Sequence, residues 1–126
     1  MRPIPLALLL LAAPLAARDR PEAGNALAER LAGRTAGAPV SCIGRFPTAR
    51  SQIVDRVVIY EDAGRLYVNE FDGEGCPALR RDRVLVTDAP SGRLCAGDIV
   101  RVVDLVAKID FGACPLGKFT PYTKVR

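Results

Sequence analysis

The 126-residue sequence contains no histidine, and this absence excludes the commonest catalytic arrangements. A Ser-His-Asp triad needs a histidine as its general base. A catalytic cysteine usually depends on a neighbouring histidine to hold its thiolate. A serine with a lysine base would be the remaining option, but no local motif supports such a pair. The residues available for it are Ser41, Ser51 and Ser91 with Lys108, Lys118 and Lys124.

Closely spaced cysteines are also absent, which argues against a metal site. The four cysteines are Cys42, Cys76, Cys95 and Cys114, separated by 34, 19 and 19 positions. Zinc sites built from cysteine usually contain Cys-x₂₋₄-Cys knuckles. An even number of cysteines in a short exported chain instead predicts two disulfides. We therefore expect neither a metal nor any other cofactor.

Four cysteines allow three disulfide pairings, and spacing alone does not select one. We favour Cys42–Cys114 together with Cys76–Cys95. The first bond would tie the two ends of the folded domain together, and the second would close the excursion around a predicted strand near residue 84.

The chain lacks an apolar run long enough to span a bilayer, but its first residues have the pattern of an export signal. After Arg2, residues 3–17 carry no charge, and small residues at Ala16 and Ala17 precede a charged stretch. An uncharged run of 15 residues falls short of the roughly 20 that a membrane-spanning helix needs. We therefore predict a cleaved signal peptide over 1–17, a periplasmic or secreted protein, and no transmembrane anchor after cleavage.

The charge balance is only mildly basic. There are 18 Lys and Arg residues against 14 Asp and Glu residues, for a net charge of +4. Nucleic-acid-binding proteins gather their cations in a dense patch, so no nucleic-acid partner is expected.

Residues 18–40 differ in composition from the rest of the chain and predict a flexible linker. The segment 25–31 has the pattern of a short helix, with Asn25 as its N-cap and Gly33 as its stop. Leu27 and Leu31, four residues apart, would allow this helix to dock on the domain.

The segment 41–126 predicts a single, mainly β domain. Val and Ile are frequent over 53–60, and 65–71 would form a hairpin with it through a turn at 61–64. Further strands are expected over 83–87, 98–106 and 118–120. Because the central strands carry apolar residues on both faces, we expect a small disulfide-clamped barrel or two-layer sandwich of about five to six short antiparallel strands.

The cysteine contexts carry a resemblance to a known family. The patterns in order are Cys42, Val54-Asp55, Tyr67-x-Asn69, Cys76-Pro77-x-Leu79, Leu94-Cys95-x-x-Asp98-Ile99 and Cys114-x-Leu116-Gly117-x-Phe119. The chain in this way resembles, over about residues 42–119, a family of small exported bacterial proteins with four cysteines and a domain of unknown function. The resemblance implies export and two disulfides, and it implies no activity, ligand or active residue.

The densest charge feature is the triplet formed by Arg80, Arg81 and Arg83. If residues 81–83 are extended, Arg81 and Arg83 project from one face of the strand. Two neighbouring guanidinium groups can grip a phosphate or a carboxylate bidentately. Arg81 and Arg83 are therefore candidate anion-binding residues, although charges at a strand edge also serve simply to keep that edge soluble.

We expect a non-catalytic exported binding or interaction module of the bacterial cell envelope. Its partner would be an unidentified envelope protein or an anionic envelope component, held by the arginines or by an inhibitor-like loop over 77–83. The alternative is a small exported hydrolase that uses a pair of carboxylates. Its candidate acids are Asp55, Glu70, Asp72, Glu74, Asp98 and Asp104.

Overall fold

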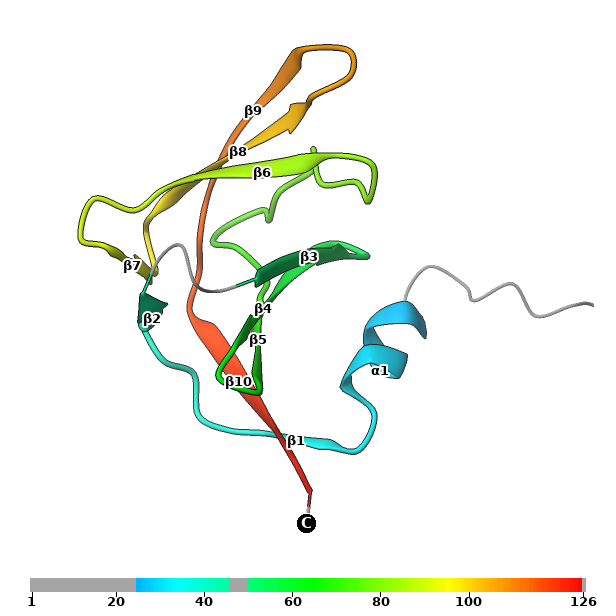
Figure 1. The fold of residues 1–126 in the computed structure, drawn as a ribbon, viewed down its shortest axis with the longest axis vertical. Helices are drawn as coiled ribbons and strands as arrows, with labels where there is room; N and C mark the ends of the chain where they lie inside the picture. Colours follow the sequence, from blue (N-terminus) through cyan, green and yellow to red (C-terminus); the bar gives the residue numbers. More distant parts are fainter. Residues whose placement is uncertain (1–24, 46–49, 126) are drawn as a thin grey trace, which may run out of the picture.

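The expectation of a mainly β fold is confirmed. The structure is a computed structural model that describes residues 25–45 and 50–125, so the predicted signal peptide and residues 18–24 lie outside the described residues. The described chain forms one helix and ten strands (Figure 1). These are α1 (Asn25–Leu31), β1 (Arg34–Ala36), β2 (Cys42–Arg45), β3 (Arg50–Val54), β4 (Val57–Asp62), β5 (Arg65–Asn69), β6 (Val84–Asp88), β7 (Arg93–Cys95), β8 (Ile99–Asp104), β9 (Ile109–Pro115) and β10 (Phe119–Lys124).

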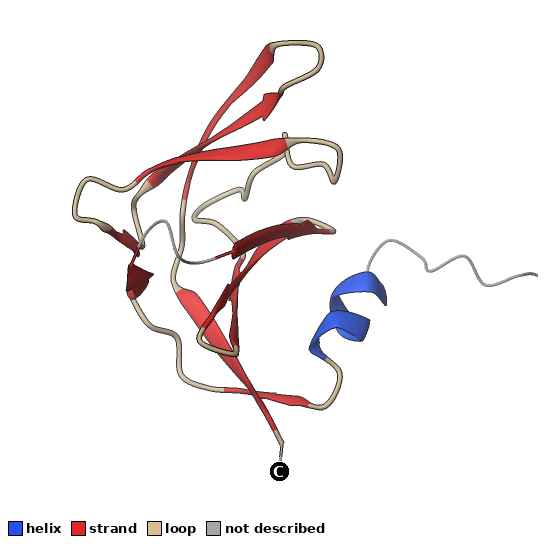
Figure 2. Ribbon diagram, in the orientation of Figure 1, coloured by secondary structure: helices blue, strands red, loops and turns tan. Residues whose placement is uncertain are grey.

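The strands form three antiparallel sheets (Figure 2). The largest has five strands in the order β1-β10-β5-β4-β3, a second pairs β2 with β7, and the third has the order β6-β8-β9. The main core lies between the five-stranded sheet and the two smaller ones, and Tyr60, Leu94, Val100 and Phe119 are among its buried residues. Over the described residues no sheet closes on itself, so of the two expected architectures the two-layer sandwich fits. The count exceeds the expected five to six because residues 53–60 belong to two strands, β3 and β4, and because β1, β7 and β9 are also present.

A second, smaller core covers the opposite face of the five-stranded sheet. There α1 packs Leu27 and Leu31 against Val54, Ile59 and Leu66. The predicted helix is thus present over the expected residues. The structure corrects the expected linker, because β1 also pairs with β10. A helix this short is stabilised by packing, here by the contact of Leu27 and Leu31 with the apolar face of the sheet.

The expected strand over 53–60 is in fact a hairpin. The chain turns at Asp55 and Arg56, and Asp55 adopts a left-handed conformation with φ of 52°. The predicted hairpin between β4 and β5 is confirmed, although its loop is the two-residue Ala63-Gly64 and not the four residues expected. Both loop residues have positive φ, which matches the right-handed twist of paired strands.

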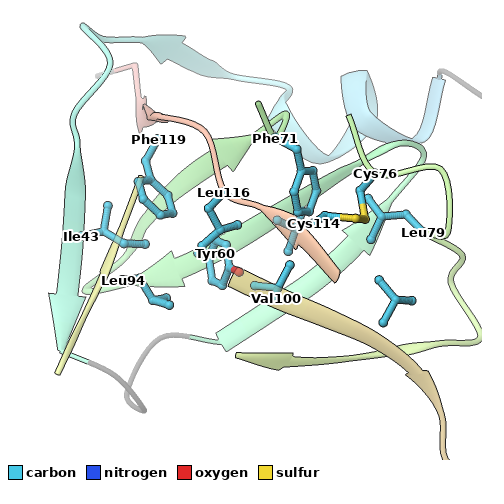
Figure 3. Close-up of a cluster of buried hydrophobic side chains, with 12 residues drawn as sticks. Ile43, Tyr60, Phe71, Cys76, Leu79, Leu94, Val100, Cys114, Leu116 and Phe119 are labelled. Carbon is cyan, nitrogen blue, oxygen red and sulfur yellow. A yellow bond between two sulfur atoms is a disulfide. The ribbon is translucent and has the colours of Figure 1, made fainter. Parts of the chain in front are cut away.

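The preferred disulfide pairing is wrong. The structure joins Cys42 to Cys95 and Cys76 to Cys114. Cys42 and Cys95 are direct partners in the β2–β7 ladder, so their side chains point to the same side. Cys76 lies in the irregular segment after β5 and meets Cys114 of β9 inside the main core (Figure 3).

A buried amide connects the end of β5 to the segment before β10. Asn69 is fully buried, and its Nδ2 donates a hydrogen bond of 2.7 Å to the Gly117 carbonyl. Its Oδ1 accepts hydrogen bonds of 3.0 Å from the backbone N–H groups of Gly117 and Phe71. Phe71 has a φ of 66°, which is unusual for a bulky residue. The Asn69 amide therefore supports a strained backbone as well as joining two segments.

Among the described residues, the Tyr60 hydroxyl is the one buried side-chain polar group that forms no hydrogen bond of normal geometry. Its ring packs edge-on against Phe119, with the centroids 5.8 Å apart. Burial raises the pKa of Tyr60 to about 12, the Thr87 hydroxyl opposes this rise, and the Asp98 carboxylate adds to it.

We expect peptide mapping without reductant to recover the pairs Cys42–Cys95 and Cys76–Cys114. We also expect Cys76→Ser with Cys114→Ser to destabilise the protein more than Cys42→Ser with Cys95→Ser. Loop length alone favours the opposite order by only about 0.3 kcal/mol. Placing two hydroxyls in the core costs about 1–3 kcal/mol. A Cys42–Cys114 fragment, or an inverted order in urea unfolding, would contradict the structure.

Replacing Asn69 by alanine should lower the free energy of unfolding by about 3 kcal/mol, because buried backbone groups lose their partners. The matched control is Asn25→Ala at the exposed start of α1, where the loss should stay within about 1 kcal/mol. Urea titrations of both variants compare them directly. Equal losses would show that the Asn69 hydrogen bonds contribute little.

Tyr60 should make stability fall at alkaline pH. Its folded-state pKa lies above the unfolded value of 10, so its contribution is fully present below about pH 10 and is lost toward pH 12. Between about pH 9 and pH 11.5 the protein should lose about 2 kcal/mol more stability than its Tyr60→Phe variant. Near neutral pH the variant should be at least as stable, because the buried Tyr60 hydroxyl forms no hydrogen bond of normal geometry with the described residues. Parallel alkaline curves for the two proteins would refute the burial effect.

Candidate anion-binding cleft

An open cleft of about 440 Å³ lies where the five-stranded sheet meets the three-stranded sheet. One wall is formed by β3, the end strand of the larger sheet, and the other by the start of β6 and the turn before it. Figure 1 shows these two strands, with α1 on the far side of β3. The lining residues are Ala26, Arg30, Ser51, Gln52, Ile53, Val54, Arg81, Arg83, Val84 and Leu85.

The charge of the cleft has one sign. Among the described residues that line it, three are arginines and none is acidic. Arg81 and Arg83 are the two residues singled out from the sequence, and the structure brings both to this cleft. Arg30, from α1, was not predicted.

Arg81 and Arg83 lie close together for a different reason from the extended strand that we expected over 81–83. Residues 81 and 82 form a turn rather than part of a strand, and β6 begins only at Val84. The Arg83 N–H donates a hydrogen bond of 3.1 Å to the Arg80 carbonyl, which closes this turn. The turn, and not strand alternation, brings both residues to the lining of the cleft.

Arg83 is held in position by two contacts. Its Nη1 donates a hydrogen bond of 2.6 Å to the Ala78 carbonyl. Its guanidinium carbon lies 3.4 Å from the centre of the Phe111 ring, as in a cation–π contact. A half-buried arginine fixed in this way has already lost much of its rotamer freedom before a ligand arrives.

Arg81 is exposed and forms no hydrogen bond or ion pair with any other described residue. Asp82, the acid beside it in the sequence, instead lies 3.2 Å from the Nε of Arg80. Both members of that pair are more than 60% exposed, so their interaction is weak. Arg81 therefore remains available to a ligand.

Arg30 reaches the cleft because α1 is docked on the sheet. The Asp55 carboxylate accepts a hydrogen bond of 3.1 Å from the Leu27 N–H and thus secures the first turn of the helix. Arg30 contacts Gln52, with its Nε 3.4 Å from the amide oxygen, and Glu61, with its Nη2 3.5 Å from the carboxylate. The Arg30–Glu61 pair is exposed, so an anionic ligand can compete for the arginine.

Sequence reasoning did not predict that Arg30, Ser51 and Gln52 line the same cleft as Arg81 and Arg83. The only local signal for Arg30 was the Leu27/Leu31 pair, which shows that the helix can dock but not where. Ser51 lines the cleft without any of the three lysines considered as its base.

The segment 77–83, expected as an inhibitor-like loop, is partly folded into the core. Leu79 is buried and Ala78 packs against the main cluster, while Pro77 and Arg80–Asp82 are exposed. Its first residue and its tip, which carries Arg81, are exposed to solvent, and the part between them is buried or half-buried.

A second cleft, of about 520 Å³, bears on the hydrolase alternative. It is lined by Glu70 and Glu74 together with Arg56 and the Cys76–Pro77 corner. Both acids are exposed, whereas the catalytic acid of a glycoside hydrolase usually sits in an apolar pocket. The structure places no two of the other candidate acids in this cleft.

All four cysteines are in disulfides, and the described residues contain no cluster of three or more His, Cys, Asp or Glu side chains suited to a metal ion. Within residues 25–45 and 50–125, no helix has the length and apolar character needed to cross a bilayer.

Comparison with protein-family models, with curated proteins and with solved structures found no match to this chain.

Proposed function

We propose that this protein is a non-catalytic binding module of the bacterial cell envelope that holds an anionic group of its partner in the arginine cleft. The observation that carries the proposal is the convergence of Arg30, Arg81 and Arg83, from two distant parts of the chain, on one cleft without an acidic lining residue. Guanidinium groups bind phosphate and carboxylate oxygens through paired, charge-assisted hydrogen bonds.

Export supports an envelope setting, periplasmic or secreted. Disulfides persist mainly in oxidising compartments, and this chain forms two. The signal-like pattern over 1–17 and the resemblance to a family of small exported bacterial proteins point the same way. The partner is then an envelope protein or an anionic envelope component.

The scaffold suits binding more than hydrolysis. The Ala78 carbonyl and the Phe111 ring preorganise Arg83, and preorganisation lowers the entropic cost of holding a ligand. In the second cleft, no hydrogen bond or ion pair with another described residue holds the side chains of Glu70 and Glu74. The hydrolase alternative therefore rests only on two exposed acids that share a cleft.

The proposal predicts salt-sensitive binding of inorganic pyrophosphate, used as a simple anionic probe. Titration should shift the side-chain Nε–H NMR signals of Arg30, Arg81 and Arg83. Replacing Arg81 and Arg83 together by alanine should weaken binding at least tenfold, because charge-assisted hydrogen bonds contribute about 1.5–3 kcal/mol each. Raising the ionic strength should also weaken binding.

The matched control is the double variant Arg65→Ala with Arg93→Ala, which removes the same charge from exposed positions outside the cleft. It should bind pyrophosphate nearly as well as the unaltered protein. Equal losses in both double variants would mean that only net charge matters. An absence of any shift at the three arginines would refute the proposal.

A further inference from the structure

The cleft runs along an unpaired strand edge. β3 ends the five-stranded sheet, and among the described residues nothing hydrogen-bonds to its outer side. Four consecutive β3 residues, 51–54, line the cleft, whereas β6 contributes only its first two residues to the opposite wall. The backbone of β3 therefore forms one side of the cleft along most of its length.

The register shows which backbone groups face the cleft. Val54 is opposite Val57 across the two-residue loop, so this pair exchanges hydrogen bonds, and Gln52 with Ile59 does so two positions on. The N–H and C=O groups of Ser51 and Ile53 therefore point away from β4 and toward the cleft. A ligand that also carries N–H and C=O groups at strand spacing can satisfy them.

The cations lie on both sides of the plane of the sheet. α1, which carries Arg30, packs on the face of Val54 and Ile59. Arg81 and Arg83 belong to the segment that packs through Leu79 on the other face, in the main core. Because side chains alternate along a strand, a chain added beside β3 would present successive side chains first to one group of arginines and then to the other.

We propose that the cleft binds an extended acidic segment of a partner protein, which adds to β3 as a sixth strand. The inference rests on the proposed anion-binding function and names its ligand as a peptide with consecutive Asp or Glu residues. A phosphate or an acidic polysaccharide would bind the arginines, but it would not form strand-pairing hydrogen bonds with the backbone N–H and C=O groups of Ser51 and Ile53. The arginines would also repel basic segments, so the same charges that protect an open edge select the partner.

The test uses the peptide acetyl-Val-Glu-Glu-Glu-Val-amide, whose central glutamate and two outer glutamates project from opposite faces of a strand. A second peptide has the same sequence with methylated amide nitrogens at alternate positions, which keeps the charge but removes ladder donors. We expect the methylated peptide to bind at least tenfold more weakly. Hydrogen exchange at the Ser51 and Ile53 amides should slow in the complex with the first peptide.

Two protein variants distinguish the contribution of strand-pairing hydrogen bonds to binding from the contribution of charge. Ser51→Pro removes one outward N–H, and proline is tolerated at such edge positions. It should lose at least tenfold more in its affinity for the peptide than in its affinity for pyrophosphate. Ser51→Ala, the matched control, keeps the N–H and removes only the hydroxyl, so any loss should be the same factor for both probes.

The outcomes distinguish this inference from the function on which it rests. Equal binding of the two peptides, in competition with pyrophosphate, would overturn strand addition and leave an anion site only. Failure of both peptides and of pyrophosphate would overturn the proposed function as well. Concentration-dependent protection of the Ser51 and Ile53 amides without peptide would show that a second copy of this chain occupies the edge, which also overturns the inference.

Discussion

The disulfide between Cys76 and Cys114 is the constraint on which the candidate site depends. The segment from Glu70 to Arg83 contains no helix or strand, so no ladder or helical hydrogen bonds hold it in place. Phe71 and Leu79 anchor it in the core, hydrogen bonds to Asn69 and to the Pro115 carbonyl hold its start, and the disulfide ties its middle to β9. Fixing a backbone residue costs about 1–2 kcal/mol, and a covalent link removes part of that cost from folding. Since this segment carries Arg81 and Arg83, a bond inside the core positions charges at the surface.

The five-stranded sheet decides where the charges meet, because it separates two cores. The smaller core binds α1 on one face, and the larger core binds the irregular segment on the other. Both attachments end near the same edge, β3, where Arg30 approaches from the helix and the other two arginines from the segment. The cleft is therefore a product of two separate packing events. Neither event by itself would place three cations around one unpaired strand.

Features with a local cause could be predicted from the sequence. The helix over 25–31 follows from its cap and its leucine pair, and the hairpin of β4 and β5 follows from two apolar runs around a glycine turn. The turn at Asp55-Arg56 was missed because the apolar run over 53–60 looks continuous in composition. β1, β7 and β9 were missed because they are short or exposed. Such strands are stabilised by the partners they pair with and not by their own residues.

Residue composition and local patterns were enough to indicate the mainly β class, two disulfides, the absence of histidine chemistry and the choice of Arg81 and Arg83 as candidates. These depend on residue type and on neighbours along the chain. The pairing of Cys42 with Cys95, the position of Arg30 beside the other arginines and the open strand edge along their cleft became visible in the folded chain. These features depend on which distant segments are brought together. That choice is made by burial of apolar faces and by strand pairing over the whole chain, and no local pattern encodes it.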